Sequence, residues 1–411
     1  MNTPKLSSEE VKEELSELGE KIGIEAEDEE DVLEPFNPED ISIQQRVVPM
    51  DVLIRRLKQR SIQLSPSFQR KEVWDVTRKS RLIESLMLNI PLPMFYVAAD
   101  EKGNWEVVDG LQRLSTIRDF MIGDKNGVML QLKKLEFLNE KFEGKTFKAI
   151  ESDPDQQKLV NDIHETEMRF TVINPGTPEA VKRNIFKRLN TGGMPLTPQE
   201  IRHALYEGQS SELLQSLVGS NIFKLTIGKK IDDSRMGASE LILRLISFMI
   251  IDRDAYKSGM DSWLSNAMRV INCFPKPTEE ELKKIFKKSE VPNLKLQSIE
   301  DIKEKFELSM ARSTELFNGH AFRKSLPNES RKSPINKSLF EVWGNVLSEL
   351  SEIDYVKLKT NKIEFIEKYT DLIHQDDDFN NAISRHSSSQ KGVIESDRKI
   401  RKMVLDIIQG E

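Results

Sequence analysis

The chain has 411 residues, a net charge of −7 and a single cysteine, Cys273. This length supports two or three domains with sizeable cores, and one cysteine excludes a disulfide within the chain. The first residues lack the basic start and apolar run of a signal peptide, and the most apolar window, residues 241–251, is too short to span a bilayer. We therefore expect a cytoplasmic protein that is not inserted in a membrane.

The charge is distributed unevenly along the chain. Residues 1–40 contain 15 acidic residues and three lysines, so this segment carries −12 and the remaining residues sum to +5. The segment is acidic and poor in aromatic residues, which predicts a mostly disordered tail, of which residues 1–34 are dispensable for folding. A mildly basic body is compatible with a polyanionic partner, but a solubilising tail on an ordinary enzyme is the alternative.

Residues 41–190 mix helical and strand patterns. Helical spacing of apolar residues predicts helices at 49–60 and around 82–87. Alternating or short apolar runs predict strands at 61–64, 94–98, 105–108 and 168–173. The strand at 105–108 runs directly into Asp109-Gly110, and a helix begins near Leu111. These patterns predict an α+β domain.

The pattern from residue 191 to 411 is almost entirely helical. Thr197-Pro198-Gln199-Glu200 is a capping box with proline at the first helical position, which is a strong helix start. Residues 239–251 predict a buried helix, and residues 336–350 and 361–374 predict two more. The basic segment 324–337 has the composition of a linker or loop. The fold class is therefore α+β, with an all-α region after the first domain.

The junction between strand, Asp109-Gly110 and helix is the most informative part of the sequence. Free backbone N–H groups and the helix dipole at such a junction attract phosphate. Gln112 and Arg113 add donors, and Asp109 is placed to orient Arg113 or to bind Mg²⁺. Two hydroxyls follow, on Ser115 and Thr116. An ordinary strand-to-helix turn is the alternative, and the local pattern alone favours it because one glycine is a weak signal.

Arg113 needs a negative partner at this position. A cation at the electropositive start of a helix is unfavourable unless an anion lies beside it. A bound phosphate would supply that anion, and so would Asp109.

Two further polar clusters and one basic run lie elsewhere in the sequence. Gln69 and Arg70 follow Phe68, and Arg188 and Asn190 lie near the end of a predicted helix. The three Arg-plus-amide clusters would form one anion site if the fold brings them together. A basic run is a candidate contact with the DNA backbone, although a solvated helix face is the alternative. The run consists of Arg55, Arg56, Lys58 and Arg60.

Taken together, several blocks of the sequence resemble the GmrSD N-terminal domain family. They follow the family's order over residues 45–210 and are more specific jointly than singly. The family pattern has glutamine where this chain has Leu111, which leaves Gln112 and Arg113 in place. The blocks are Ser65-Pro66-x-Phe68-Gln69-Arg70-x-x-Val73-Trp74, Ile83-Glu84-Ser85-Leu86, Ile90-Pro91-Leu92-Pro93, Val108-Asp109-Gly110-Leu111-Gln112-Arg113-Leu114-Ser115-Thr116, and Phe186-Lys187-Arg188-Leu189-Asn190-Thr191-Gly192-Gly193 with Leu196-Thr197-x-x-Glu200-Ile201-Arg202.

The resemblance implies a fold like that of ParB and sulfiredoxin, in which this turn grips nucleotide phosphates. It implies a nucleoside triphosphate, with Mg²⁺ at Asp109, and catalytic roles for Asp109 and Arg113. It further implies nucleotide-binding roles for Gln69, Arg70, Gly110, Gln112, Arg113, Ser115, Thr116, Arg188 and Asn190. Sulfiredoxin chemistry is excluded because the turn contains no cysteine. The five histidines are not clustered, so we predict a member without the His-Asn-His nuclease module.

Two functions remain open from the sequence. The first is a nucleotide-binding regulatory or sensor protein, with or without NTP hydrolysis, in a prokaryotic restriction or anti-phage defence system. Its expected partners are DNA and a nuclease or methyltransferase, and an oligomer is compatible with it. The alternative is a non-enzymatic DNA-binding or adaptor module that docks a partner protein. The predicted domains are an acidic tail at 1–40, the nucleotide-binding domain at 41–190 and a helical domain at 191–411.

Overall fold

The chain forms two compact units, one of which is made from two separate segments of the sequence. One unit is Glu34–Leu196, and the other combines Met1–Leu33 with Thr197–Glu411. In the sequence, the α+β unit is thus inserted between the two segments of the helical unit. The computed structural model describes residues 13–15, 21–27, 42–64, 74–178, 181–182, 184–185, 197–228, 233, 235–257, 259–286, 291–327 and 329–410.

A five-stranded mixed sheet organises the α+β unit. Its order is β3-β7-β5-β6-β4, in which β3 and β7 are antiparallel, β7 and β5 parallel, β5 and β6 antiparallel, and β6 and β4 parallel. α3 starts directly at the end of β6, because Gly110 alone separates the two elements. The strands are β3 (Ile43–Pro49), β4 (Ile62–Gln63), β5 (Phe95–Ala99), β6 (Trp105–Asp109) and β7 (Glu167–Ile173).

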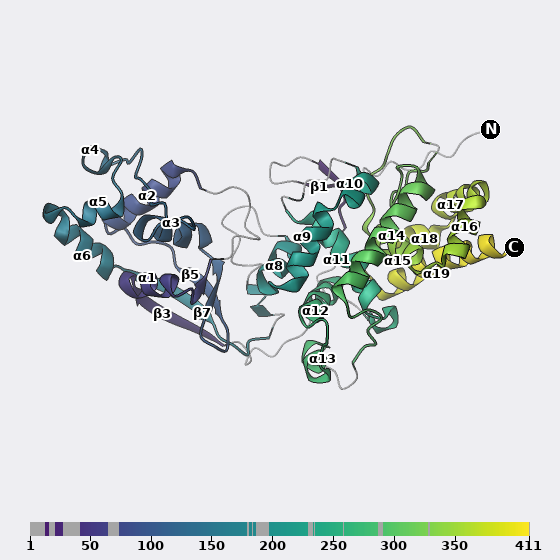
Figure 1. The fold of residues 1–411 in the computed structure, drawn as a ribbon, viewed down its shortest axis with the longest axis horizontal. Coiled ribbons are helices and arrows are strands. Elements are labelled where there is room, and N and C mark those ends of the chain that lie inside the picture. The colour runs from purple at the N-terminus through teal and green to yellow at the C-terminus, as the bar shows by residue number, and fades with distance from the viewer. Residues whose placement is uncertain are drawn as a thin grey trace. The chain divides into compact units, whose positions relative to one another are not determined.

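Helices cover one face of this sheet (Figure 1). Alternate strand residues such as Phe95, Trp105 and Phe170 join the apolar faces of the helices in one core. The Phe95 and Trp105 rings each lie against Phe170, with centroids 5.1 and 5.2 Å apart. The helices are α1 (Met50–Lys58), α2 (Val76–Met87), α3 (Leu111–Met121), α4 (Asn139–Phe142), α5 (Phe147–Glu151) and α6 (Gln157–Glu165).

The second unit is built on two helices, α11 and α15, in which every residue except Glu240 and Glu349 is buried. They approach closely because Gly344 of α15 has no side chain, and a Cβ there would lie 2.5 Å from Leu245 of α11. The helices are α8 (Pro198–Leu205), α9 (Gln209–Gly219), α10 (Asn221–Ile227), α11 (Gly237–Ile250), α12 (Met260–Asn272), α13 (Glu279–Phe286), α14 (Ile299–Phe317), α15 (Lys337–Glu349), α16 (Glu352–Thr360), α17 (Lys362–Gln375), α18 (Asp377–Ile383) and α19 (Gln390–Gln409).

The structure confirms the fold class, an α+β part followed by a helical region. Among the described residues, no helix combines the length and the apolar character that a membrane crossing requires.

The acidic segment is the main departure from the sequence-based prediction. β1 (Glu13–Leu15) pairs with β2 (Lys21–Glu25), and Ile22 and Ile24 are buried in the core of the helical unit. The Glu25 backbone N–H donates to the Ile335 carbonyl at 2.8 Å. The disordered tail predicted for residues 1–40 is therefore wrong for residues 13–15 and 21–27. Composition averages over the segment, whereas two isoleucines at the right spacing are enough to dock it.

The basic segment 324–337 is also more than a linker. Ile335 is fully buried and forms a parallel bridge with Ile24. Asn336 caps α15 through its side chain, which accepts from the Leu339 N–H at 2.9 Å. Serine and proline lowered the apparent helical and strand tendency here, but tertiary contacts with the acidic segment order it.

Candidate functional site

The turn between β6 and α3 depends on a glycine. Gly110 is the N-cap of α3 with a φ of 98°, a left-handed conformation that residues with a side chain rarely adopt. A Cβ at this position would also lie 2.4 Å from the Phe95 ring. As a glycine, the N-cap residue has no side chain that could cap the helix. The first N–H groups of α3 therefore keep their capacity to bind an anion.

Arg113 is held in place by the chain itself. Its guanidinium lies 2.8 Å from Asp109 Oδ2 and donates to the carbonyl oxygens of Pro93 and, at 3.4 Å, Met94. It also lies over the Phe95 ring, 4.6 Å from the centroid. These contacts connect the start of β5 with the start of α3.

Asp109 supplies the negative partner that the sequence predicted for Arg113. The Arg113 side chain is only 13% exposed, and burial lowers its pKa from the ordinary value while Asp109 opposes that shift. Arginine nevertheless stays charged in proteins. The turn thus contains a preformed ion pair between Arg113 and Asp109. A bound phosphate would share Arg113 with Asp109 and would not be its only anionic partner.

The other residues of the turn have different roles. Gln112 Oε1 accepts from the Trp74 N–H at 3.4 Å, which fixes its amide beside the residues preceding α2. The Ser115 side chain is half-buried, and its hydroxyl forms no hydrogen bond with a described residue. Thr116 is fully buried, and its hydroxyl donates to the Gln112 carbonyl at 2.7 Å. Ser115 is therefore available to a ligand at this turn, whereas the Thr116 hydroxyl is used within the helix.

Asp109 is the carboxylate at the turn that fits a metal ion. Its side chain is 38% exposed, and one oxygen contacts Arg113. No group of three or more His, Cys, Asp or Glu side chains in the described part of the chain could hold a metal ion. Mg²⁺ in nucleotide sites takes one or two protein carboxylates together with phosphate and water oxygens. Asp109 therefore fits an ion that arrives with a nucleotide.

The remaining nucleotide-binding candidates lie outside the described residues. They are Gln69, Arg70, Arg188 and Asn190. Their convergence with the turn at Asp109 stays a prediction.

The basic run on α1 splits into two groups. Arg55, Lys58 and Arg60 are exposed. Arg56 instead lies over the Trp105 ring at 3.9 Å and donates to the Gly103 carbonyl at 2.7 Å. Arg56 thus packs against the sheet, and the other three cations form the part of the run that can meet a polyanion.

The sequence missed the partners that position Arg113. Among the sequence patterns, Pro93 belongs only to the block Ile90-Pro91-Leu92-Pro93, yet its carbonyl accepts a hydrogen bond from the Arg113 guanidinium. Phe95 also packs on it and limits residue 110 to glycine. A backbone carbonyl leaves no trace in a sequence pattern. The Pro-Leu-Pro block that precedes β5 was the only available signal.

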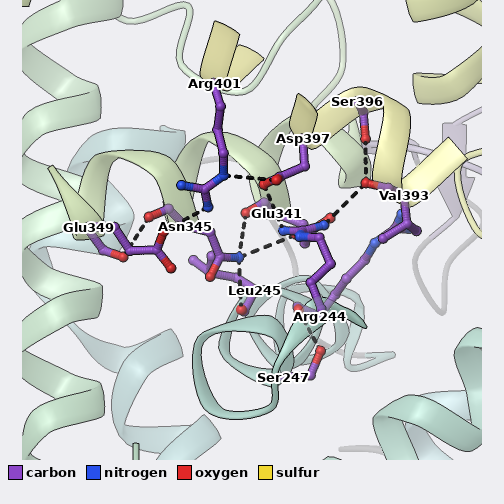
Figure 2. A network of polar contacts seen from close by, with 12 residues as sticks. Arg244, Leu245, Ser247, Glu341, Asn345, Glu349, Val393, Ser396, Asp397 and Arg401 are labelled. Atoms are coloured by element: carbon purple, nitrogen blue, oxygen red, sulfur yellow. Dashed lines mark hydrogen bonds and ion pairs between the residues drawn. The ribbon is translucent and has the colours of Figure 1, made fainter. Parts of the chain in front are cut away.

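A second polar cluster lies in the helical unit, between α11, α15 and α19 (Figure 2). Glu341 is fully buried and accepts from Arg253, which also lies 3.3 Å from Asp397. Arg401 contacts both Asp397, at 2.8 Å, and Glu349, at 2.7 Å. Opposite charges thus face one another throughout this cluster, and its ion pairs hold the helices together. None of the predicted site residues belongs to it.

The capping block at α8 also contributes to the fold. Thr197 and Glu200 form the predicted capping box. Arg202 is 1% exposed and contacts Glu240 at 2.5 Å and Asp261. The block therefore secures α8 inside the helical unit.

Comparison with known proteins gives one result. No curated protein and no solved structure matches the chain. The likeness to ParB and sulfiredoxin that the family resemblance implies stays a prediction. The family described as GmrSD restriction endonuclease, N-terminal domain, matches residues 53–207, a stretch that contains the turn at Asp109 and continues through α8. Residues 53–207 are thus similar to the GmrSD restriction endonuclease N-terminal domain, as the sequence blocks predicted.

Proposed function

We propose that this chain is a nucleotide-binding regulatory or sensor protein of a DNA-restriction or anti-phage defence system. The domain at residues 53–207 connects it with restriction. Nucleotide phosphates would bind at the start of α3, where Gly110 and the following N–H groups face them. Gln112 and Ser115 would add side-chain donors, and Asp109 would hold a nucleotide-bound Mg²⁺.

One observation carries this proposal: the left-handed Gly110 leaves the start of α3 without a side-chain cap, beside the Asp109–Arg113 pair. A helix start without a cap attracts anions through its N–H groups and its dipole. Arg113 is fixed beside this helix start by Pro93, Phe95 and Asp109, so its positive charge would attract a phosphate bound there. Hydrolysis would need, in addition, a positioned water near Asp109.

Ser115→Glu tests the proposal without removing a contact of the fold. The Ser115 hydroxyl forms no hydrogen bond with a described residue, so the variant should fold, but the added carboxylate should repel a bound triphosphate. Calorimetric titration with each of the four NTPs and Mg²⁺ should show saturable binding to the wild-type chain. Ser115→Glu should weaken that binding about tenfold or more, which corresponds to about 1.4 kcal/mol.

Gln131→Glu is the matched control, because it adds the same charge at an exposed residue of the same unit. Its affinity should equal that of the wild type. Equal affinities for wild type and Ser115→Glu would refute phosphate binding at α3. Nucleotide-independent DNA binding with a steep salt dependence would instead favour the adaptor function, with Arg55, Lys58 and Arg60 on the DNA backbone.

A further inference from the structure

An exposed aromatic side chain projects from the α+β unit just before α4. Phe137 is 76% exposed, although phenylalanine is normally among the most buried residues. Figure 1 shows α4 beyond α2 and α5 on the side away from the sheet. Phe137 lies outside the core to which its neighbours Leu135 and Phe142 belong.

The loop that presents Phe137 is anchored by buried side chains. Glu84 of α2 is 3% exposed and accepts the backbone N–H groups of residues 136, 137 and 138 at 2.9, 2.7 and 2.8 Å. Ser80, also on α2 and fully buried, accepts the Lys133 N–H at 2.9 Å. The exposed ring is thus held on a fixed backbone, and little conformational entropy is lost when a ligand covers it.

The surface around the ring is rich in lysine. Residues 133–148 contain five lysines and three glutamates. Lys133, Lys134 and Lys148 are exposed and form no ion pair with a described residue. Of the glutamates, Glu136 is paired with Arg81 at 3.0 Å, Glu143 keeps its charge while it accepts the backbone N–H of Lys134 at 2.8 Å, and Glu140 is exposed. Lysines that form no ion pair with a described residue therefore outnumber such glutamates in this segment.

We propose that Phe137 and the lysines at 133, 134 and 148 bind single-stranded nucleic acid, with an unpaired base stacked on the Phe137 ring. An exposed aromatic ring accepts any base because every base has a π-face, and nearby lysines contact the phosphates. A duplex offers no unpaired base to the ring. The site goes beyond the proposed function, because it is separate from the phosphate turn at Asp109 and names a different ligand.

Fluorescence anisotropy of a labelled 20-nucleotide oligothymidylate with the full chain tests this site. Wild type should bind the single strand more tightly than a duplex of the same length. Phe137→Ala should weaken the binding about five- to a hundredfold, the range for loss of one stacked base. Phe137→Trp should preserve it, and its added tryptophan fluorescence should change on binding. Lys133→Gln should lower the salt dependence by about 0.7 in the slope of log K against log salt.

Leu225→Ala is the matched control, because it also removes an exposed apolar side chain, 70% exposed, from helix α10. It should bind like the wild type. The proposal is overturned if the wild type does not bind the oligonucleotide or if Phe137→Ala binds it as tightly as the wild type. Calorimetry with mononucleotides reports separately on the turn at Asp109, so failure of one site is distinguishable from failure of the other.

Discussion

At the scale of single residues, Arg113 shows how one side chain can serve both the fold and a ligand. Its contacts to Asp109 and to the carbonyl of Pro93 would be lost in an alanine variant. The Arg113→Ala variant would therefore lose stability as well as any phosphate contact. Variants that spare these contacts, such as Ser115→Glu, give the cleaner test of binding.

Gly110→Ala should destabilise the α+β unit for two separate reasons. A left-handed φ of 98° costs a residue with a Cβ about 1–2 kcal/mol, and the new Cβ would contact the Phe95 ring. Gly103→Ala is the matched control, since Gly103 has a φ of 80° but no atom within 4 Å of its added Cβ. Urea unfolding should show the larger loss for Gly110→Ala. Equal losses would mean that the Phe95 contact contributes nothing.

At the scale of elements, Glu84 connects α2 with the loop before α4, because its carboxylate accepts three backbone N–H groups of that loop. Burial alone would raise the pKa of Glu84, but the three backbone N–H donors lower it below the ordinary value. A carboxylate with a lowered pKa stabilises the folded chain above its unfolded pKa of about 4.3. That contribution is lost as the pH falls through the lower, folded-state pKa.

Glu84→Gln should therefore loosen the loop at neutral pH. Hydrogen exchange of the N–H groups of residues 136–138 should be faster than in the wild type, and the difference should shrink in acid. Glu136→Gln is the control, because Glu136 and Arg81 are both about half exposed and such pairs contribute little. Unchanged exchange in Glu84→Gln would show that the backbone of the loop is fixed by other contacts.

Local patterns predicted the elements that carry their own signals. The helix predicted around 82–87, the strands predicted at 94–98 and 105–108, and the Thr197 capping box all agree with the structure. β3 escaped prediction because six of its seven residues are exposed, all except Val48, and its partner β7 is more than 110 residues away. Asp109, Gly110 and Arg113 were identified because they lie close together in the sequence. The carbonyls that accept from the guanidinium were not, because they belong to Pro93 and Met94, about 20 residues away in the sequence.

At the scale of the whole molecule, the chain starts and ends in the same unit. Carboxylates of the acidic segment form ion pairs with two buried cations of the helical unit. Glu14 lies 2.6 Å from Lys337, which is 6% exposed. Glu27 lies 2.8 Å from Arg244, which is 1% exposed. A buried cation without its partner is strongly unfavourable, so the segment that composition describes as a tail is part of the helical unit.

Glu27→Gln should lower the free energy of unfolding of the helical unit by about 1.5–3 kcal/mol, the range for a hydrogen bond to a charged group. Burial would raise the pKa of Glu27, but Arg244 lowers it overall, so the stabilisation is present at neutral pH and lost in acid. Glu13→Gln is the control, because its partner Lys21 is exposed and 3.6 Å away, and its loss should stay within about 0.5 kcal/mol.

Deletion of residues 1–34 extends the same test to the whole segment. It removes Glu14 and Glu27, which pair with Lys337 and Arg244, together with the buried Ile22 and Ile24. Among the described residues, it leaves Lys337 with Glu240 alone as an ion-pair partner. Hydrogen exchange should become faster in α11 and α15 of the helical unit, while the core of the α+β unit stays protected. If the truncated chain keeps wild-type protection in α11 and α15, the segment is dispensable, as its composition alone predicts.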